Sequence, residues 1–150
     1  MSETSPRLAL VVSQFNPEVT LGLRDGALAY LGENGIMIAP DNVYSAPGAF
    51  EIPLIAKRLA QSGFDGVICL GCVIKGDTAH FEYISEATAH GLMQVGLETG
   101  KPITFGILTT YTEEQAILRS RKDEHNKGRE AAAACLEVLR TINPVTLSYR

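Results

Sequence analysis

Short apolar runs alternate with segments of helical periodicity along the chain, and this alternation constrains the fold more than any other feature. The apolar runs predict four strands, at residues 8–12, 42–45, 67–72 and 103–109. The helical segments predict five helices, at residues 17–31, 50–61, 81–98, 113–121 and 127–142. Strands joined through helices run parallel, with helices on both faces of the sheet. We therefore expect an α/β fold: a three-layer α-β-α sandwich with a four-stranded parallel sheet.

Capping residues mark several of the expected helix ends. Asn16 stands directly before a proline, and we expect it to cap the first helix. Gly100 is expected to end the third helix. Thr112 and Gln115 have the spacing of a capping box for the short fourth helix. Asn126 is expected to cap the last helix.

Segments rich in glycine, hydroxyl and aromatic residues follow the predicted strands directly. The run 67–72 is apolar on both faces, which is typical of a central strand in a parallel sheet. In flavodoxin-like and related folds, ligands bind beyond the carboxyl ends of such strands. The segments that would meet there are 15–16, 47–51, 74–80 and 109–110. We therefore expect flavodoxin-like order and a binding site at this rim.

Composition limits the class of protein. At 150 residues the chain fits one domain, 1–150, with a short arm at 1–7 and a tail at 143–150. A net charge of −4 gives no reason to expect nucleic acid as a partner. The three cysteines are an odd number, which argues against a disulfide framework and for a reducing compartment. We see no signal peptide or membrane-spanning run, so we expect a cytoplasmic protein with no membrane partner.

The segment from Gly71 to Tyr83 predicts a site of chemistry. An apolar strand runs into Gly76, Thr78 and His80, and a helix begins. Free backbone N–H groups and the helix dipole favour phosphate at such a junction. Histidine is the side chain best suited to proton transfer near neutral pH. The segment therefore predicts a catalytic corner that binds a phosphorylated small molecule, although His80 could instead only bond a backbone carbonyl.

Three other readings of the motifs are weaker. The spacing Gly71-x-x-x-x-Gly76 approaches a nucleotide-binding P-loop, but Asp77 replaces the required lysine and would repel phosphate. Cys69 and Cys72 form a Cys-x-x-Cys on a strand, where residues three apart point to opposite faces and suit neither a disulfide nor a metal. The other two histidines, in a helix and a polar loop, are expected to be structural. We expect no metal and no cofactor.

Six segments together resemble the lumazine synthase family of riboflavin biosynthesis. The first is Gly-x-Val-Ile-x-Gly-x-Thr-x-His-x-x-Tyr at residues 71–83. The others are Ser13–Asn16, Pro47–Pro53, Phe105–Thr110, Glu114–Arg119 and Asn126–Gly128. Their order along nearly the whole chain makes the resemblance specific.

The resemblance implies an activity. Family members condense 5-amino-6-(D-ribitylamino)uracil with 3,4-dihydroxy-2-butanone 4-phosphate to 6,7-dimethyl-8-ribityllumazine, releasing phosphate and water. The alternative is a non-catalytic flavin- or lumazine-binding module on the same fold. That module could lose the histidine and the phosphate contacts, so retention of His80, Thr78 and Arg119 favours the enzyme.

The resemblance also implies a role for individual residues. His80 would transfer protons, Phe15 would stack on the pyrimidine, and Glu51 would accept hydrogen bonds from the ribityl chain. The residues implied around the pyrimidine are Phe15, Ala49, Phe50, Glu51, Cys72, Val73, Ile74 and Phe105. Those implied around the phosphate are Asp77, Thr78 and Arg119, with Lys127 as an addition. From the residues alone, the phenylalanines could be core aromatics and Arg119 a solvated surface residue.

Family active sites lie between subunits of a pentameric ring, with Phe105 and Arg119 supplied by the neighbour. The resemblance therefore implies a homopentamer, or a face-to-face decamer, with small-molecule substrates. The short arm and the loop 121–125, which lacks the usual glycine, favour stopping short of an icosahedral shell. Asp77 and Gln14 also depart from the family pattern, and Asp77 puts a carboxylate beside the implied phosphate site.

Overall fold

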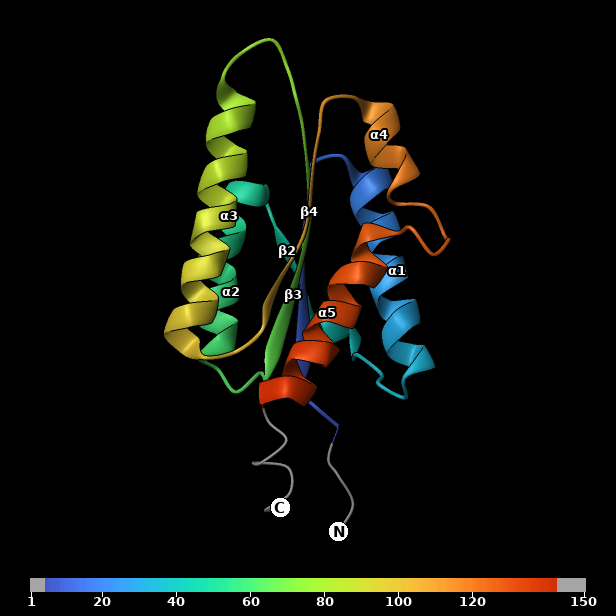
Figure 1. Cartoon of the computed structure of the whole chain (residues 1–150), viewed down its shortest axis with the longest axis vertical. Helices are drawn as coiled ribbons and strands as arrows, with labels where there is room; N and C mark the ends of the chain where they lie inside the picture. The colour runs from blue at the N-terminus through green and yellow to red at the C-terminus, as the bar shows by residue number, and fades with distance from the viewer. Residues whose placement is uncertain (1–4, 143–150) are drawn as a thin grey trace.

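A computed structural model describes residues 5–142 and shows a parallel sheet of four strands in the order β2-β1-β3-β4 (Figure 1). The strands are β1 (Leu8–Ser13), β2 (Val43–Ala46), β3 (Gly66–Ile74) and β4 (Ile103–Thr110). Every strand pair is parallel, and β3 lies between β1 and β4. The expected sheet and its central strand are confirmed.

Helices cover both faces of the sheet, which confirms the three-layer architecture. The α-helices are α1 (Pro17–Glu33), α2 (Ile52–Ala60), α3 (His80–Thr99), α4 (Glu113–Leu118) and α5 (Lys127–Ile142). Two short 3-10 helices, η1 (Pro40–Asn42) and η2 (Ala49–Glu51), flank β2. Helices α2 and α3 lie on one side of the sheet, and α1 and α5 on the other (Figure 1). No helix among the described residues is long and apolar enough to cross a membrane.

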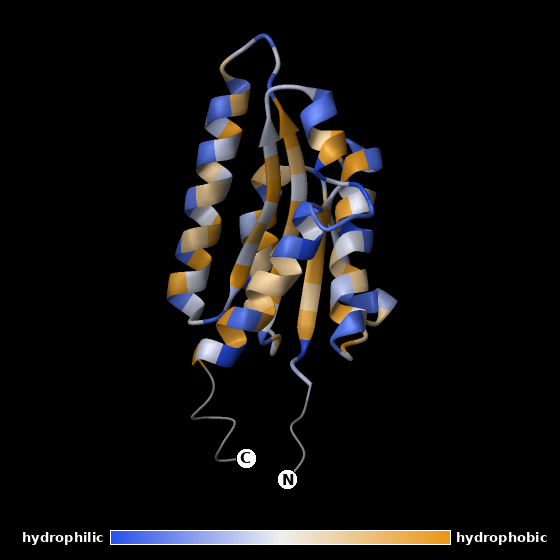
Figure 2. Ribbon diagram, turned by 45° about the vertical axis from the view of Figure 1, so that its right-hand side comes forward, coloured by the Kyte–Doolittle hydropathy of each residue, from blue (hydrophilic) through white to orange (hydrophobic). Residues whose placement is uncertain are grey.

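The sheet separates two hydrophobic cores. Because side chains alternate between the two faces of β3, this strand contributes residues to both cores. Ile68, Leu70 and Cys72 pack in the core shared with α1 and α5. Val67 and Cys69 pack in the core shared with α2 and α3. The strands are accordingly the most hydrophobic elements in Figure 2. The two cysteines of the Cys-x-x-Cys thus lie on opposite faces, as the strand period requires.

Three of the predicted helix ends are confirmed. The Thr112 hydroxyl accepts from the Gln115 backbone N–H at 3.2 Å, and the Gln115 side chain accepts from the Thr112 N–H at 3.2 Å, which completes the capping box. The Asn126 side-chain oxygen accepts from the Arg129 backbone N–H at 3.0 Å. Gly100 follows α3 with a left-handed φ of 69°, a conformation that glycine adopts without strain.

The prediction that the Asn16 side chain caps α1 is wrong. Asn16 occupies the N-cap position but has a left-handed backbone, with φ 58° and ψ 58°, and no side-chain capping bond. Its amide Nδ2 instead donates to the carbonyl oxygen of Cys72 at 3.3 Å. A tertiary contact with the end of β3 therefore replaces the local cap.

Several boundaries differ from the expected ones, and for two strands the cause is their mutual pairing. Ile74 pairs with Thr110, so β3 and β4 both run further than predicted. The segment expected to begin the second helix first forms η2, and α4 ends at Leu118 instead of near residue 121. Helix α3 begins at His80 itself. The expected tail, 143–150, and the first four residues of the arm lie outside the described residues.

Candidate active site

The ends of β1, β2 and β3 are joined at the carboxyl rim of the sheet. The Gln14 backbone N–H donates to the Ala46 carbonyl at 2.8 Å, and the Gln14 side chain donates to the Ser45 hydroxyl at 2.8 Å. On the other side, Asn16 donates to the carbonyl of Cys72. The short turn after β1 is therefore fixed to both neighbouring strands, and it holds Phe15 between them.

Phe15 and Glu51 lie next to each other at this rim. A Cβ atom at Gly48 would stand 2.9 Å from two Phe15 ring carbons and 3.2 Å from a Glu51 carboxylate oxygen. The lack of a side chain at Gly48 thus makes room for both groups. Phe15 remains 68% exposed and Phe50 58% exposed, so neither ring is part of the core. The rim presents aromatic surface beside a carboxylate, whereas Ala49 is buried beneath them.

The end of β3 forms the wall behind this surface. Cys72 is buried, and Val73 and Ile74 are half-buried. Burial raises the pKa of the Cys72 thiol to about 11, with a smaller contribution from the charge of Glu113. The sulfur therefore stays protonated at neutral pH, so Cys72 can line a site as a neutral side chain.

The loop after β3 carries the polar groups of the predicted catalytic corner. Asp77, Thr78 and His80 are all exposed. The His80 backbone N–H donates to the Thr78 hydroxyl at 3.4 Å. His80 is the first residue of α3, so its imidazole stands at the positive end of a helix dipole. An imidazole, a hydroxyl and backbone N–H groups at one helix end suit a phosphorylated substrate that must gain or lose protons.

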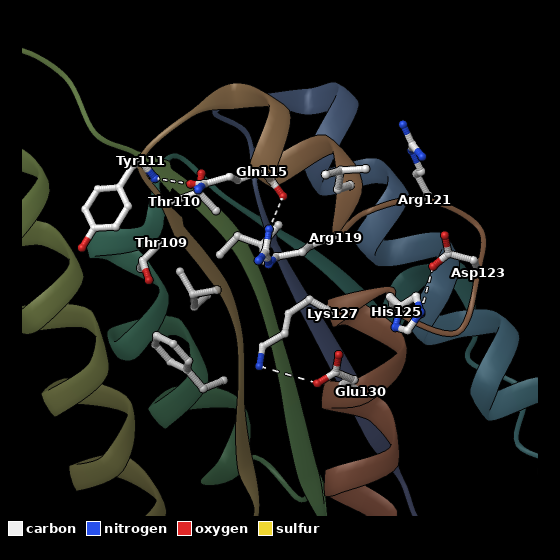
Figure 3. Close-up of a pocket in the computed structure, with 14 residues that line it drawn as sticks. Thr109, Thr110, Tyr111, Gln115, Arg119, Arg121, Asp123, His125, Lys127 and Glu130 are labelled. Atoms are coloured by element: carbon white, nitrogen blue, oxygen red, sulfur yellow. Dashed lines mark hydrogen bonds and ion pairs between the residues drawn. The ribbon is translucent and has the colours of Figure 1, made fainter.

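A second concave surface follows the free edge of β4. It is an open groove of about 840 Å³ between β4, α4 and the start of α5 (Figure 3). Three of the predicted site residues, Phe105, Arg119 and Lys127, line it. Arg119 donates through Nη1 to the Gln115 carbonyl at 3.0 Å, and the Lys127 ammonium lies 3.9 Å from Glu130. Both cations extend toward β4, whereas Arg121 points away (Figure 3).

The structure thus divides the predicted site residues into two groups. The first group lies at the rim. It consists of His80, the loop residues Asp77 and Thr78, and all the residues predicted around the pyrimidine except Phe105. Over the described residues, the lining of the β4 groove includes none of these rim residues. One chain therefore presents two half-sites, which we call the rim half-site and the β4 half-site.

A sequence model of 6,7-dimethyl-8-ribityllumazine synthase matches residues 5–143. The chain belongs to the 6,7-dimethyl-8-ribityllumazine synthase family. Three relatives carry that name. The Caulobacter vibrioides protein, named synthase 1, is 58% identical over 141 residues, with 93% of this chain and 92% of the relative covered. The Protochlamydia amoebophila protein is 46% identical, covering 94% and 83%, and a Coxiella burnetii protein is 43% identical, covering 99% of each.

Sequence reasoning missed the contacts that hold the predicted catalytic corner of this lumazine synthase family member. The Lys75 ammonium lies 3.2 Å from Glu82 and 5.9 Å from the centre of the Tyr111 ring, and the Lys75 N–H donates to the Thr110 carbonyl at 2.9 Å. Phe81 packs on Tyr111 at 6.0 Å between ring centres. These contacts join both ends of the loop 75–80 to β4. Only the opposite charges of Lys75 and Glu82 signal this in the sequence, and Lys75 lies outside the helix that carries Glu82.

Metal chemistry has no visible ligand set in the described part of the chain. Within residues 5–142, no group of three or more histidine, cysteine or acidic residues could hold a metal ion. The three cysteines are free and buried.

Proposed function

We propose that this protein condenses 5-amino-6-(D-ribitylamino)uracil with 3,4-dihydroxy-2-butanone 4-phosphate, giving 6,7-dimethyl-8-ribityllumazine, phosphate and water. The observation that carries the proposal is the rim half-site. It combines an exposed imidazole at the start of α3, a hydroxyl at Thr78, and an aromatic ring beside the carboxylate of Glu51. The names of the relatives give the same reaction product.

The pyrimidine substrate would occupy the aromatic part of the rim. Phe15, exposed and held between β1, β2 and β3, can stack on a flat heterocycle. Glu51 can accept hydrogen bonds from the ribityl hydroxyls, since a carboxylate is a strong acceptor. The groups that would face the ring edges are the backbones of Ala49, Phe50, Val73 and Ile74, with Cys72 in the wall behind.

The butanone phosphate would sit at the catalytic corner. The N–H groups at the start of α3 and the Thr78 hydroxyl can bind its phosphate, together with a guanidinium from Arg119. Asp77 lies in the same loop, and its exposed carboxylate can turn to solvent. His80 would carry protons while the amine forms an imine with the ketone, the phosphate leaves and the second ring closes. Holding the two substrates together would supply much of the acceleration.

The complete site would form between two copies of the chain. Since Phe105 and Arg119 lie in the β4 half-site, a neighbouring subunit has to supply them to the rim half-site. We propose a ring of five subunits, alone or as a face-to-face decamer. Exposed apolar side chains on α3 support such contacts: Met93 is 65% and Leu97 77% exposed. The three free thiols are in keeping with a reducing, cytoplasmic location.

The direct test mixes both substrates with the purified protein and follows product fluorescence and phosphate release. We expect lumazine to form in a one-to-one ratio with phosphate, faster than in a protein-free control. Binding of the pyrimidine without turnover would contradict the proposal and indicate a non-catalytic binding module.

A further inference from the structure

Two glycines of α1 bring the loop after α4 into direct contact with this helix. Gly22 and Gly26 are four residues apart, so they lie on the same face of α1. A Cβ atom at Gly22 would stand 2.4 Å from the Ser120 carbonyl oxygen. One at Gly26 would stand 2.1 Å from the Asn126 side-chain oxygen and 2.8 Å from its nitrogen. Any larger residue at these positions would push the loop away from the helix.

Asn126 makes the contact at Gly26 specific. The residue is 1% exposed, and its Nδ2 donates to the Gly22 carbonyl at 3.1 Å and to the Arg121 carbonyl at 2.8 Å. Its Oδ1 accepts from the backbone N–H of Arg129 at 3.0 Å. Both amide hydrogens and one lone pair are thereby used in a buried setting. A single side chain thus joins α1, the loop and the first turn of α5.

The two cations that extend toward β4 stand at the two ends of the same loop. The loop begins at Arg119 and leads into Lys127, the first residue of α5, whose backbone N–H donates to the Arg119 carbonyl at 2.8 Å. At the start of α5 the approach to α1 is equally close, because a Cβ at Gly128 would meet the Leu23 carbonyl at 1.9 Å. The backbone positions of both cations therefore depend on how the loop sits on α1.

We propose that Asn126 is a positioning residue for the phosphate contact of the β4 half-site. By fixing the loop to the glycine face of α1, it sets where the Arg119 guanidinium meets the phosphate of the butanone substrate. Asn126 itself is buried and does not reach the substrate. The inference rests on the proposed function, since it names a support for one contact of that reaction.

Gly26→Ala tests the inference without changing any group in the groove. The added methyl has to displace the Asn126 amide. Gly32→Ala is the matched control, because Gly32 is also in α1 and a Cβ there meets nothing within 4 Å. A misplacement of about 1 Å can lower a rate by about 100-fold. We expect Gly26→Ala to raise KM for the butanone phosphate by about tenfold or more, to weaken inhibition by inorganic phosphate in parallel, and to leave KM for the pyrimidine within about twofold.

Asn126→Asp is the second variant. It keeps the acceptor for the Arg129 N–H but loses both donors, so we expect the same selective rise in KM for the butanone phosphate. If Gly26→Ala does not assemble, this variant carries the test. A lower Tm with unchanged KM values, or an equal rise in both, would show a merely structural role and overturn the inference. An inactive wild-type protein would instead overturn the proposed function, so the two failures are distinguishable.

Discussion

Several side chains of the rim half-site are exposed instead of packed in the core. His80 has no side-chain hydrogen-bond partner among the described residues, although its backbone N–H is bonded to Thr78. The rings of Phe15 and Phe50 are likewise exposed and do not belong to the hydrophobic core. Contact with the two substrates is the role we propose for these side chains, and substitution of single residues tests it.

The first residue-scale prediction concerns His80. Removing a positioned proton donor and acceptor lowers a rate by about 10²–10⁴-fold, and we expect His80→Ala to lower kcat by about 10²-fold, with Tm unchanged because the side chain is exposed. His90→Ala is the control, since His90 is exposed on the same helix, with Glu86 at 4.0 Å. Wild-type turnover of His80→Ala at saturating substrate would show that His80 takes no part in the reaction.

The second residue-scale prediction concerns Arg119. A charge-assisted hydrogen bond contributes about 1.5–3 kcal/mol. Arg119→Ala should therefore raise KM for the butanone phosphate by at least about tenfold, with a much smaller effect on the pyrimidine. Arg121→Ala is the control, because Arg121 lines the same groove but points away from it (Figure 3). Equal effects of the two variants would mean that only the overall charge of the groove matters.

At the scale of the elements, α1 and α5 are held together by contacts of different strength. Buried apolar residues such as Leu23 and Leu136 belong to their shared core. On the surface, the Arg129 guanidinium bonds both carboxylate oxygens of Glu33, at 2.8 Å and 2.5 Å, and lies 5.2 Å from the centre of the Tyr30 ring. The loop that carries Arg119 lies against this helix pair. The stability of the α1–α5 contact therefore affects the position of Arg119 in the β4 half-site.

The element-scale prediction follows from the charge of Glu33. Its hydrogen bonds to Arg129 hold the pKa of the Glu33 carboxyl below the ordinary value of 4.5. A carboxyl with a lowered pKa in the folded state stabilises the protein above the unfolded value, and this contribution disappears as the pH falls through the folded value. Glu33→Gln should therefore lower Tm slightly at about pH 7, and the difference from wild type should shrink at an acid pH below 4.5, as the pH falls through the lowered value of the folded state.

The control for the ion pair is Glu137→Gln, an exposed carboxylate on α5 for which the described residues provide no ion pair. Thermal unfolding followed by circular dichroism at both pH values gives the comparison. A difference between wild type and Glu33→Gln that persisted unchanged at low pH would show that the ion pair is not its source.

At the scale of the whole molecule, the two half-sites decide what a single chain can do. They lie on different surfaces of the chain, so the proposed arrangement is heterologous, with the rim of one subunit facing the β4 edge of the next. Heterologous contacts give a ring when the rotation between subunits closes, and the ring proposed here closes at five subunits. A single chain without a neighbour would have both half-sites but no complete active site. We therefore expect light scattering to show a pentamer or a decamer.

Hybrid rings test this arrangement directly. When His80→Ala and Arg119→Ala chains are co-expressed with different tags and mixed rings are purified, about one quarter of the interfaces join an intact rim to an intact β4 edge. At a butanone phosphate concentration far below the KM of the Arg119→Ala variant, we expect about that share of the wild-type rate. Rings of His80→Ala chains carrying both tags are the control. Activity no higher than the mean of the two parent variants would show that both residues act within one chain.

Local patterns in the sequence were enough for the elements and their order. The two-residue and 3.6-residue periods predicted the strands and helices, and both Cys69 and Cys72 fell on the faces that the strand period requires. The caps at Thr112 and Asn126 were predictable because each bond joins residues three apart. The family resemblance, which rests on side chains at fixed spacing, is confirmed by the match over residues 5–143.

Contacts between distant residues were decided only by the tertiary structure. The Asn16 side chain does not cap α1 but donates to the Cys72 carbonyl, 56 residues away, because the sheet brings that acceptor within reach. Asn126 reaches Gly22 across 104 residues, so its role beyond capping is invisible in its local sequence. Phe105 and Arg119 are likewise separated from His80 because β4 is an edge strand and both residues line the groove along it. Spacing along a chain fixes bonds within a turn, whereas packing of whole elements decides which surfaces are left for a neighbour.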